Sequence, residues 1–141
     1  MKSQSTEQMI EFLKRAQRIA EIGSWDWNIV DNTEHWSDEQ FRIFGYEPLS
    51  VKPTHQLFID SIHKDDKVRV VKAIDDILSD DTPFDLELRI HCNEGQLKLI
   101  HSQGSVYRDD KGDPIRMVGT MQDITTRKIT ASQLSESDQN P

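Results

Sequence analysis

The sequence predicts an α+β domain built around an antiparallel β-sheet. Two observations carry this prediction. Apolar and polar residues alternate in the manner of strands near residues 24–36 and again over 84–122, and the segment between these stretches has helical spacing. Strands and helices segregated along the chain in this way favour an antiparallel sheet that helices cover on at least one face. The 141 residues have the length of one domain.

An amphipathic helix is predicted over residues 9–22. Its apolar residues recur at intervals of three and four, which places them on one face; they are Met9, Phe12, Leu13, Ala16, Ile19 and Ala20. Ser5 with Gln8 matches a capping box at its start. Gly23 is the predicted stop, because glycine commonly ends helices.

Two strands and a short helix are expected next. Residues 24–29 alternate between apolar and polar side chains, which is typical of a half-buried strand, and a brief second strand covers 34–36. Ser37 then has the side chain and the following acidic residues of a helix N-cap. This helix should end at Gly45.

Two more helices complete the middle third of the chain. Pro53 and Thr54 open a short helix. Asp65 and Asp66 are predicted to cap a longer helix, whose apolar residues are Val68, Val71, Ile74 and Leu78.

A three-strand meander is predicted after the helices. Strict alternation marks a strand over 84–91, the Asn-Glu-Gly sequence at 93–95 marks a hairpin turn, and a second strand covers 96–107. A turn at 109–114 precedes the last strand, 115–122. Beyond it the sequence becomes polar, and we expect a helix there that needs a partner.

Charge and composition exclude several function classes. The net charge is −8 and the pI is about 5.0, with no basic cluster beyond Arg127–Lys128. We therefore expect no nucleic-acid partner. The longest apolar runs are far shorter than a membrane span, so we expect no membrane contact by this segment. Cys92 is the single cysteine and cannot form an internal disulfide, and the chain opens with no secretory leader. These features predict a cytoplasmic protein.

Five ordered motifs resemble those of a PAS domain of the PAC-containing bacterial type. They are AEIGSWDW at 20–27, WSDEQFRIFGY at 36–46, IHKDD at 62–66, FDLELR at 84–89 and GTMQDITTRK at 119–128. The resemblance covers residues 12–134. It implies the PAS fold: a five-stranded antiparallel sheet with short helices on one face, often around a small-molecule cavity. It also implies a sensory module that signals through flanking helices to a histidine kinase or diguanylate cyclase output domain.

The resemblance divides the chain into three parts. Residues 1–22 would form the amino-terminal flanking helix, 23–124 the PAS core with its PAC segment, and 125–141 a carboxy-terminal linker helix with a polar tail. The chain departs from the family's pattern at Lys64, where proline is frequent, and at Leu99, where an aromatic residue is frequent. The second departure makes it unsafe to carry over a relative's ligand.

Candidate pocket residues gather in the first half of the chain, where the family's cavity would be walled. They are Trp25, Trp27, Trp36, Phe41, Phe44, Tyr46, Leu57, Phe58, Ile62 and Val71. Plain core packing accounts for the same aromatic residues, and both interpretations stay open.

Cofactor chemistry finds little support in the sequence. A flavin adduct to cysteine is not expected, because Cys92 lies at a strand end and outside the Asn-Cys-Arg-Phe motif of PAS-like light sensors. His55 and His63 are the candidate haem ligands, but a residue at position 63 is better suited to capping a helix, and we expect no haem. His91 and His101 are predicted to lie too far apart to share a metal ion, so no metal site is expected. The acidic turn at 109–113 lacks the spacing of a calcium loop.

A relay and a dimer are the remaining expectations. Asp123, Ile124 and Thr125 follow the last strand, where the Asp123 carboxylate can accept hydrogen bonds from the next amides and couple the sheet to the following helix. A static cap fits the same residues. The apolar stripe of the first helix, Met9, Phe12, Leu13, Ala16 and Ile19, predicts a homodimer.

Three functions remain in contention. The first is a module that binds a small molecule and relays the signal. The second is a ligand-free PAS dimerisation and relay module. The third and weakest is a small enzyme, because no nucleophile elbow or phosphate loop is present and catalysis is not expected.

Overall fold

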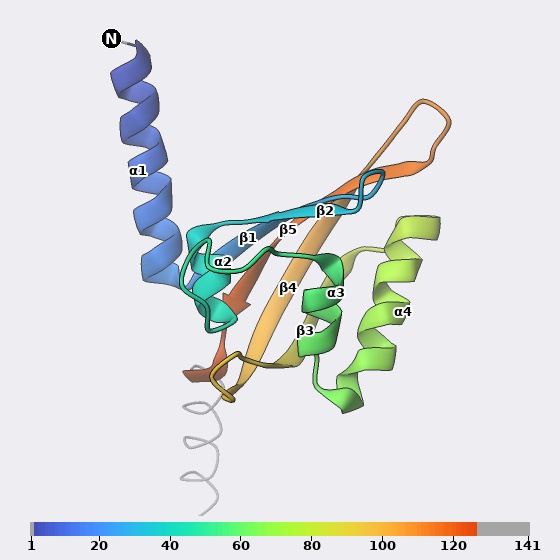
Figure 1. Cartoon of the computed structure of the whole chain (residues 1–141). Helices are drawn as coiled ribbons and strands as arrows, with labels where there is room; N and C mark the ends of the chain where they lie inside the picture. The colour runs from blue at the N-terminus through green and yellow to red at the C-terminus, as the bar shows by residue number, and fades with distance from the viewer. Residues whose placement is uncertain (1, 127–141) are drawn as a thin grey trace, which may run out of the picture.

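The computed structural model describes the backbone of residues 2–126 and the side chains of residues 5–126. Four helices and five strands follow one another in the predicted order (Figure 1). They are α1 (Lys2–Ala20), β1 (Ile22–Asn28), β2 (Thr33–Trp36), α2 (Asp38–Ile43), α3 (His55–Ser61), α4 (Lys64–Asp80), β3 (Phe84–His91), β4 (Leu97–Arg108) and β5 (Pro114–Asp123). The expected carboxy-terminal helix and tail fall almost wholly outside the described residues.

All five strands form one antiparallel sheet in the order β2-β1-β5-β4-β3. The predicted meander is confirmed, with β4 pairing β3 and β5 on its two sides. β5 also pairs β1, which brings the first and last strands together at the centre of the sheet. Helices α2, α3 and α4 lie over one face of the sheet, as the α+β prediction requires (Figure 1).

The two faces of the sheet differ in chemistry because side chains alternate along each strand. The helix-covered face carries the core; on β3, for example, Phe84, Leu88 and Ile90 are buried. The opposite face is polar, and Asp26 on β1 accepts a hydrogen bond from Arg116 Nε on β5 at 2.8 Å. This pair joins β1 to β5 on the face opposite the helices.

Side-chain caps start the three core helices. The Ser37 hydroxyl accepts from the backbone N–H of Gln40, and the Thr54 hydroxyl accepts from that of Leu57 at 2.9 Å, as predicted. The N-cap of α4 is His63, as the capping role expected at position 63 requires, and its Nδ1 accepts from the Asp65 N–H at 3.1 Å. Asp65 and Asp66 lie in the first turn of the helix and are not its N-cap, which corrects the other prediction.

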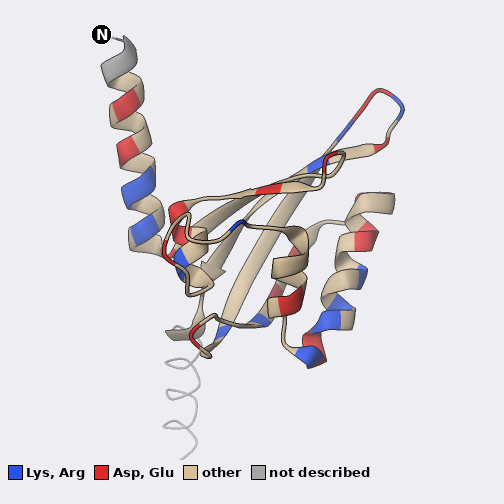
Figure 2. Ribbon diagram, viewed as in Figure 1, with Lys and Arg blue, Asp and Glu red and all other residues tan. Residues whose placement is uncertain are grey.

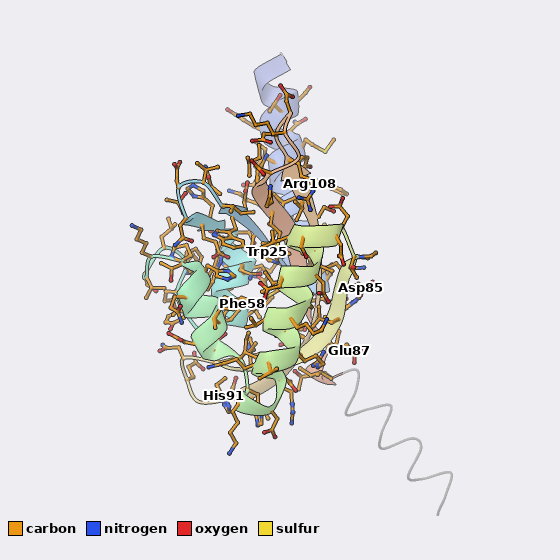
Figure 3. The ribbon with its side chains drawn as sticks, turned by 90° about the vertical axis from the view of Figure 1, so that its right-hand side faces the viewer. Trp25, Phe58, Asp85, Glu87, His91 and Arg108 are labelled. Carbon is orange, nitrogen blue, oxygen red and sulfur yellow. The ribbon has the colours of Figure 1, made fainter. Side chains whose placement is uncertain are left out.

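Asp66 has another role. It is buried, and its carboxylate accepts from the backbone N–H, Nε and Nη2 of Arg89 on β3. These bonds hold α4 against the sheet edge and keep the pKa of Asp66 far below its usual value. At the other end of α4, Arg108 Nη2 donates to the carbonyls of Ile77 and Leu78 at 3.0 and 2.8 Å, and Figure 3 shows Arg108 beside that end of the helix.

The end of α1 differs from the prediction. The helix stops at Ala20, and Glu21 takes the left-handed conformation with φ of 56° that Gly23 was expected to supply. Gly23 lies inside β1, where a Cβ atom would stand 2.3 Å from Oε1 of the buried Gln40 side chain. The glycine is needed for the close approach of α2, which the local sequence pattern does not reveal.

No helix within residues 2–126 is both long and apolar enough to cross a membrane. Charged residues of both signs are spread along the ribbon, including α1 and the hairpin between β4 and β5 (Figure 2).

Candidate functional site

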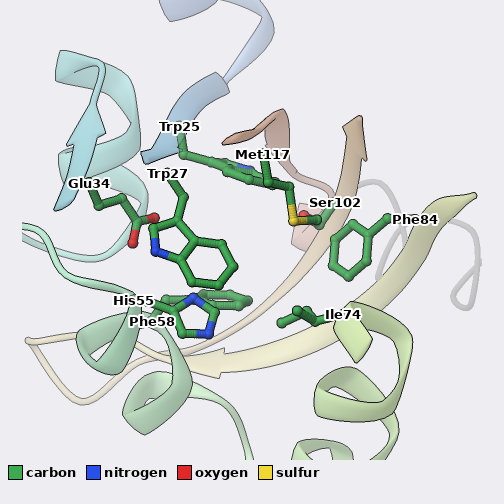
Figure 4. Close-up of a pocket in the computed structure, with 9 residues that line it drawn as sticks. All are labelled: Trp25, Trp27, Glu34, His55, Phe58, Ile74, Phe84, Ser102 and Met117. Carbon is green, nitrogen blue, oxygen red and sulfur yellow. The ribbon is translucent and has the colours of Figure 1, made fainter. Parts of the chain in front are cut away.

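A small cavity lies between the sheet and the helices α3 and α4 (Figure 4). The residues that line it come from seven elements; they are Trp25, Trp27, Glu34, His55, Phe58, Ile74, Phe84, Ser102 and Met117. It offers about 20 Å³ to the centre of a water molecule. That is room for about one water.

The indole of Trp25 forms the floor of this cavity because two glycines leave space for it. Gly104 and Gly119 face each other on β4 and β5. A Cβ atom on Gly119 would lie 2.4 Å from Trp25 Cζ2, and one on Gly104 would lie 3.0 Å from Trp25 Cη2. Phe84 then meets the indole edge to face, with 6.4 Å between the ring centroids.

Trp27 and His55 form an outer wall, and both are half-buried. Their rings stack with a centroid separation of 4.0 Å and an interplanar angle of 3°. Trp27 Nε1 donates to Asn32 Oδ1 at 3.0 Å, which fixes the indole. Burial lowers the pKa of His55, so its imidazole is neutral at pH 7.

Glu34 brings a carboxyl group to the cavity from β2. One of its oxygens, Oε1, accepts from Trp36 Nε1 at 3.0 Å, and the other, Oε2, is buried with no hydrogen-bond partner among the described residues. Burial raises the pKa of Glu34 to about 7, against 4.5 for an ordinary glutamate.

Two further polar atoms of the cavity residues are buried without a partner in the described part of the chain. They are Ser102 Oγ, on a residue with no exposed surface, and Trp25 Nε1. Unsatisfied buried polar atoms are uncommon in native proteins and call for an explanation such as a bound water or ligand. Here they surround the same cavity.

The structure separates the ten predicted pocket residues into three groups. Trp25, Trp27 and Phe58 line the cavity. Trp36, Phe41, Phe44 and Ile62 are buried in the surrounding core, and Tyr46 and Leu57 pack against that core. Val71 lies on the solvent side of α4 with 37% of its surface exposed.

Six of the nine cavity residues are absent from the predicted pocket set, namely Glu34, His55, Ile74, Phe84, Ser102 and Met117. A signal existed for Glu34, because it lies two positions before Trp36 on a predicted strand and so shares its face. His55 was considered only as a haem ligand. The position of Ser102 depends on the inner face of β4, which alternation alone did not identify.

A second site is the junction where α1 enters the sheet and β5 leaves it. Gln122 Nε2 donates to the carbonyl of Ala20 at 3.2 Å, and the Asp123 N–H donates to that of Glu21 at 3.2 Å. The two segments that flank the sheet are thereby tied together.

The predicted relay residues lie in this junction. Asp123 Oδ1 accepts from the Thr125 N–H at 3.0 Å, which is the local bond expected of it. The Leu99 carbonyl accepts from the Ile124 N–H at 3.0 Å, and the Leu99 N–H donates to Thr125 Oγ1 at 2.9 Å. The residues after β5 are therefore held against β4.

A lysine connects this junction to α2. Lys98 Nζ donates to the Ile43 carbonyl at 2.8 Å and lies 3.9 Å from Asp123 Oδ2. The same carbonyl accepts from Cys92 Sγ at 3.2 Å, and Cys92 is buried, which raises the pKa of its thiol. Cys92 is not among the residues that line the cavity described above.

The two histidines considered as a metal pair, His91 and His101, lie apart from each other. His101 pairs with Glu87 in the register of β3 and β4, four residues from His91, and it contacts Asp85. His63 caps α4 and stacks on His91. Within the described residues no three His, Cys, Asp or Glu side chains cluster as metal ligands would.

The predicted dimer stripe is exposed on α1, which extends away from the sheet (Figure 1). The exposed fractions are 57% for Met9, 67% for Phe12, 50% for Leu13 and 84% for Ile19, and Ala16 is also exposed. Within the described part of the chain, nothing covers this face.

Comparisons with known proteins agree with this geometry. The sequence model of the family described as PAS fold matches residues 33–121. The probable diguanylate cyclase DgcE of Escherichia coli K12 is 28% identical over 125 residues, which are 89% of this chain and 11% of that protein. A sensory box histidine kinase/response regulator from Burkholderia thailandensis has a similar structure, with a TM-score of 0.74 and 32% identity, over 90% of this chain and 95% of that one.

The N-terminal domain of a diguanylate cyclase with PAS/PAC sensor from Marinobacter aquaeolei shares the fold, with a TM-score of 0.68 and 19% identity over 76% of this chain and 98% of that one. The chain spans only 11% of the length of DgcE, and so matches one domain of a larger protein. It is homologous to sensor domains of histidine kinases and diguanylate cyclases. The chain therefore belongs to the PAS fold family.

Proposed function

We propose that this chain is the sensory, non-catalytic module of a bacterial signal-transduction protein of the histidine kinase or diguanylate cyclase type. It binds a small molecule in the cavity and relays that event to an output domain. The junction carries this proposal, because the carbonyls at the end of α1 accept hydrogen bonds from Gln122 and Asp123 at the end of β5. The relatives, in which such a chain is one domain of a larger protein, support an output domain.

The relay follows from the two strands that join the cavity to the junction. Trp25 on β1 and Met117 on β5 line the cavity, and the same strands lead to Glu21 and Asp123 at the junction. An occupant that displaces either side chain shifts its strand. Asp123, bonded to the N–H of Thr125, then redirects the segment that follows.

A homodimer through α1 belongs to the same proposal. The uncovered apolar stripe on α1 supports it, because a helix with one apolar face is stabilised by burying that face against a partner. Pairing two α1 helices would join the junctions of the two copies.

One observation favours the ligand-free alternative, in which the module only dimerises and relays. The cavity offers about 20 Å³, whereas ligand pockets commonly have several hundred Å³. Only a very small molecule fits without side-chain movement.

Native mass spectrometry of the purified chain, with an ultraviolet and visible absorption spectrum, separates the two alternatives. A stoichiometric co-purified molecule is the result expected of the ligand-binding module. A dimer of the polypeptide alone, with no visible absorbance, would favour the ligand-free relay if a fluorescence screen of small molecules also found no ligand.

The relay is tested by joining the chain to a cyclase output domain and filling the cavity with Ser102→Leu. We expect this substitution to change cyclase activity in the parent fusion and to leave activity unchanged when Asp123→Ala is also present. Asp110→Ala, in the exposed turn between β4 and β5, is the matched control. Equal responses with and without Asp123→Ala would contradict the relay, and thermal unfolding confirms that each fusion is folded.

A further inference from the structure

Glu34 is half-buried, its Oε2 atom is fully buried, and no cationic side chain pairs with it within the described residues. Its Oε2 atom has no hydrogen bond within the described residues, and no lysine or arginine is among the residues that line the cavity. Burial raises its pKa to about 7, so near neutral pH the group exists in both protonation states. A carboxylate held in this way gains from any cation that can reach it.

Most of the remaining lining is also favourable to positive charge; the buried Trp25 N–H, a donor, is the exception. Aromatic rings line it from β1, α3 and β3, namely Trp25, Trp27, Phe58 and Phe84, and the faces of such rings carry negative potential. The imidazole of His55 adds no positive charge, because burial lowers its pKa. Figure 4 shows the Glu34 carboxyl turned toward the indole of Trp27 and the interior of the cavity.

Other ligand classes fit these residues less well. An anion would meet Glu34 with no lysine or arginine to offset the repulsion. A purely apolar molecule would leave Glu34 Oε2 and Ser102 Oγ without partners. A cation with N–H groups can donate to Oε2 while the ring faces stabilise its charge.

The size of the cavity limits that cation. About 20 Å³ holds one group the size of a water molecule, so an ammonium head group fits without rearrangement. A longer amine would have to separate the rings of Trp27 and His55, which are both half-buried and stack in contact with 4.0 Å between their centroids.

We propose that the cavity is a binding site for a small organic amine, whose ammonium group pairs with Glu34 Oε2 inside the aromatic wall. This inference rests on the proposed function, because it names the ligand class of the proposed sensory site. Among the described residues that line the cavity, His55 from α3 is the other titratable group. The lining residues from β1, α4, β3, β4 and β5 are uncharged.

The test titrates the whole chain with methylammonium chloride and follows tryptophan fluorescence. The chain has three tryptophans; Trp25 and Trp27 line the cavity, and Trp36 is bonded to Glu34. Potassium chloride at equal concentration controls for ionic strength, and methanol is the uncharged probe of similar size. We expect a saturable change in fluorescence with methylammonium chloride, and none with potassium chloride or methanol.

Variants identify the group that binds the cation. Glu34→Gln keeps an oxygen for Trp36 and removes the charge, and it should weaken methylammonium binding about thirtyfold or more, the usual effect of removing one partner of a buried charge pair. Glu94→Gln, the same change at an exposed residue, should bind as the parent does. Binding to the parent should also tighten as the pH rises through about 7, because Glu34 must ionise to form the pair.

Three results would overturn the amine proposal. They are no saturable response in a folded protein, equal binding by the parent and Glu34→Gln, or methanol binding as tightly as methylammonium. The proposed sensory function would survive each of them if the Ser102→Leu fusion still depended on Asp123. It would fail separately if that dependence were absent while methylammonium bound.

Discussion

Replacing Glu34 by glutamine should remove a pH dependence from the stability of the fold. Burial raises the pKa of Glu34 from 4.5 to about 7, so the folded state binds this proton more tightly than the unfolded state does. Between these two values the folded protein carries more protons. Its free energy of unfolding therefore falls as the pH rises through the window.

The magnitude follows from the size of the shift. A difference of roughly 2.5 pH units, at about 1.4 kcal/mol for each unit, amounts to about 3 kcal/mol. The parent protein should lack this stabilisation above pH 7 and have all of it below pH 4.5. Glu34→Gln has no proton to lose, so its stability relative to the parent should increase by about 3 kcal/mol across the window.

Urea unfolding followed by tryptophan fluorescence measures this difference. Other groups titrate in the same range, and His55 acts in the opposite direction, because a lowered histidine pKa makes stability rise with pH up to 6.5. The difference between parent and variant cancels such contributions. Glu94→Gln, the same change at an exposed residue, is the matched control. A difference between parent and Glu34→Gln that stays constant from pH 4.5 to above 7 would refute the reasoning.

Three further predictions concern the packing, the edge of the sheet and the dimer. Gly119→Ala should destabilise the fold by about 2 kcal/mol or more in urea unfolding, because its Cβ would overlap the Gln103 carbonyl oxygen and the Trp25 indole. Ser105→Ala, on the exposed face, should have little effect. Equal stabilities of the two variants would contradict the packing described. Asp66→Asn should cost about 3 kcal/mol at neutral pH. Because the pKa of Asp66 is lowered, its contribution to the stability of the fold is present above pH 3.8 and is lost as the pH falls below that value. If the parent and Asp66→Asn lost stability in parallel under acid, this role of Asp66 would be contradicted. Phe12→Glu, at a side chain that is 67% exposed, should convert a dimer to a monomer in sedimentation. The unfolding midpoint measured in dilute solution should not change. A variant that still forms the dimer would exclude this face of α1 as the dimer interface.

The elements were predictable from local signals. Alternation over residues 84–91 gave β3 with its observed bounds, and the hydroxyls of Ser37 and Thr54 cap α2 and α3 as predicted. These features depend on residues that are neighbours along the chain. The end of α1 was not predictable in this way, because Gly23 serves a contact with Gln40 on another element.

The candidate site depends on contacts between distant parts of the sequence. Gly119 leaves room for Trp25 only in the observed register of β1 and β5, and nothing in the local pattern determines that register. The elevated pKa of Glu34 arises from burial by elements that lie far away in the sequence. Aromatic composition alone could not tell residues that line the cavity, such as Trp27, from core residues such as Phe41.

Coupling between the cavity and the junction is the central claim, and amide hydrogen exchange tests it most directly. The measurement compares the parent with Glu34→Gln above pH 7, where only the parent carries the charge in the cavity. The account predicts altered exchange at the junction amides of Asp123, Ile124 and Thr125, which lie at the end of β5 and directly after it. Altered exchange confined to β2 and α3, beside Glu34, would contradict it.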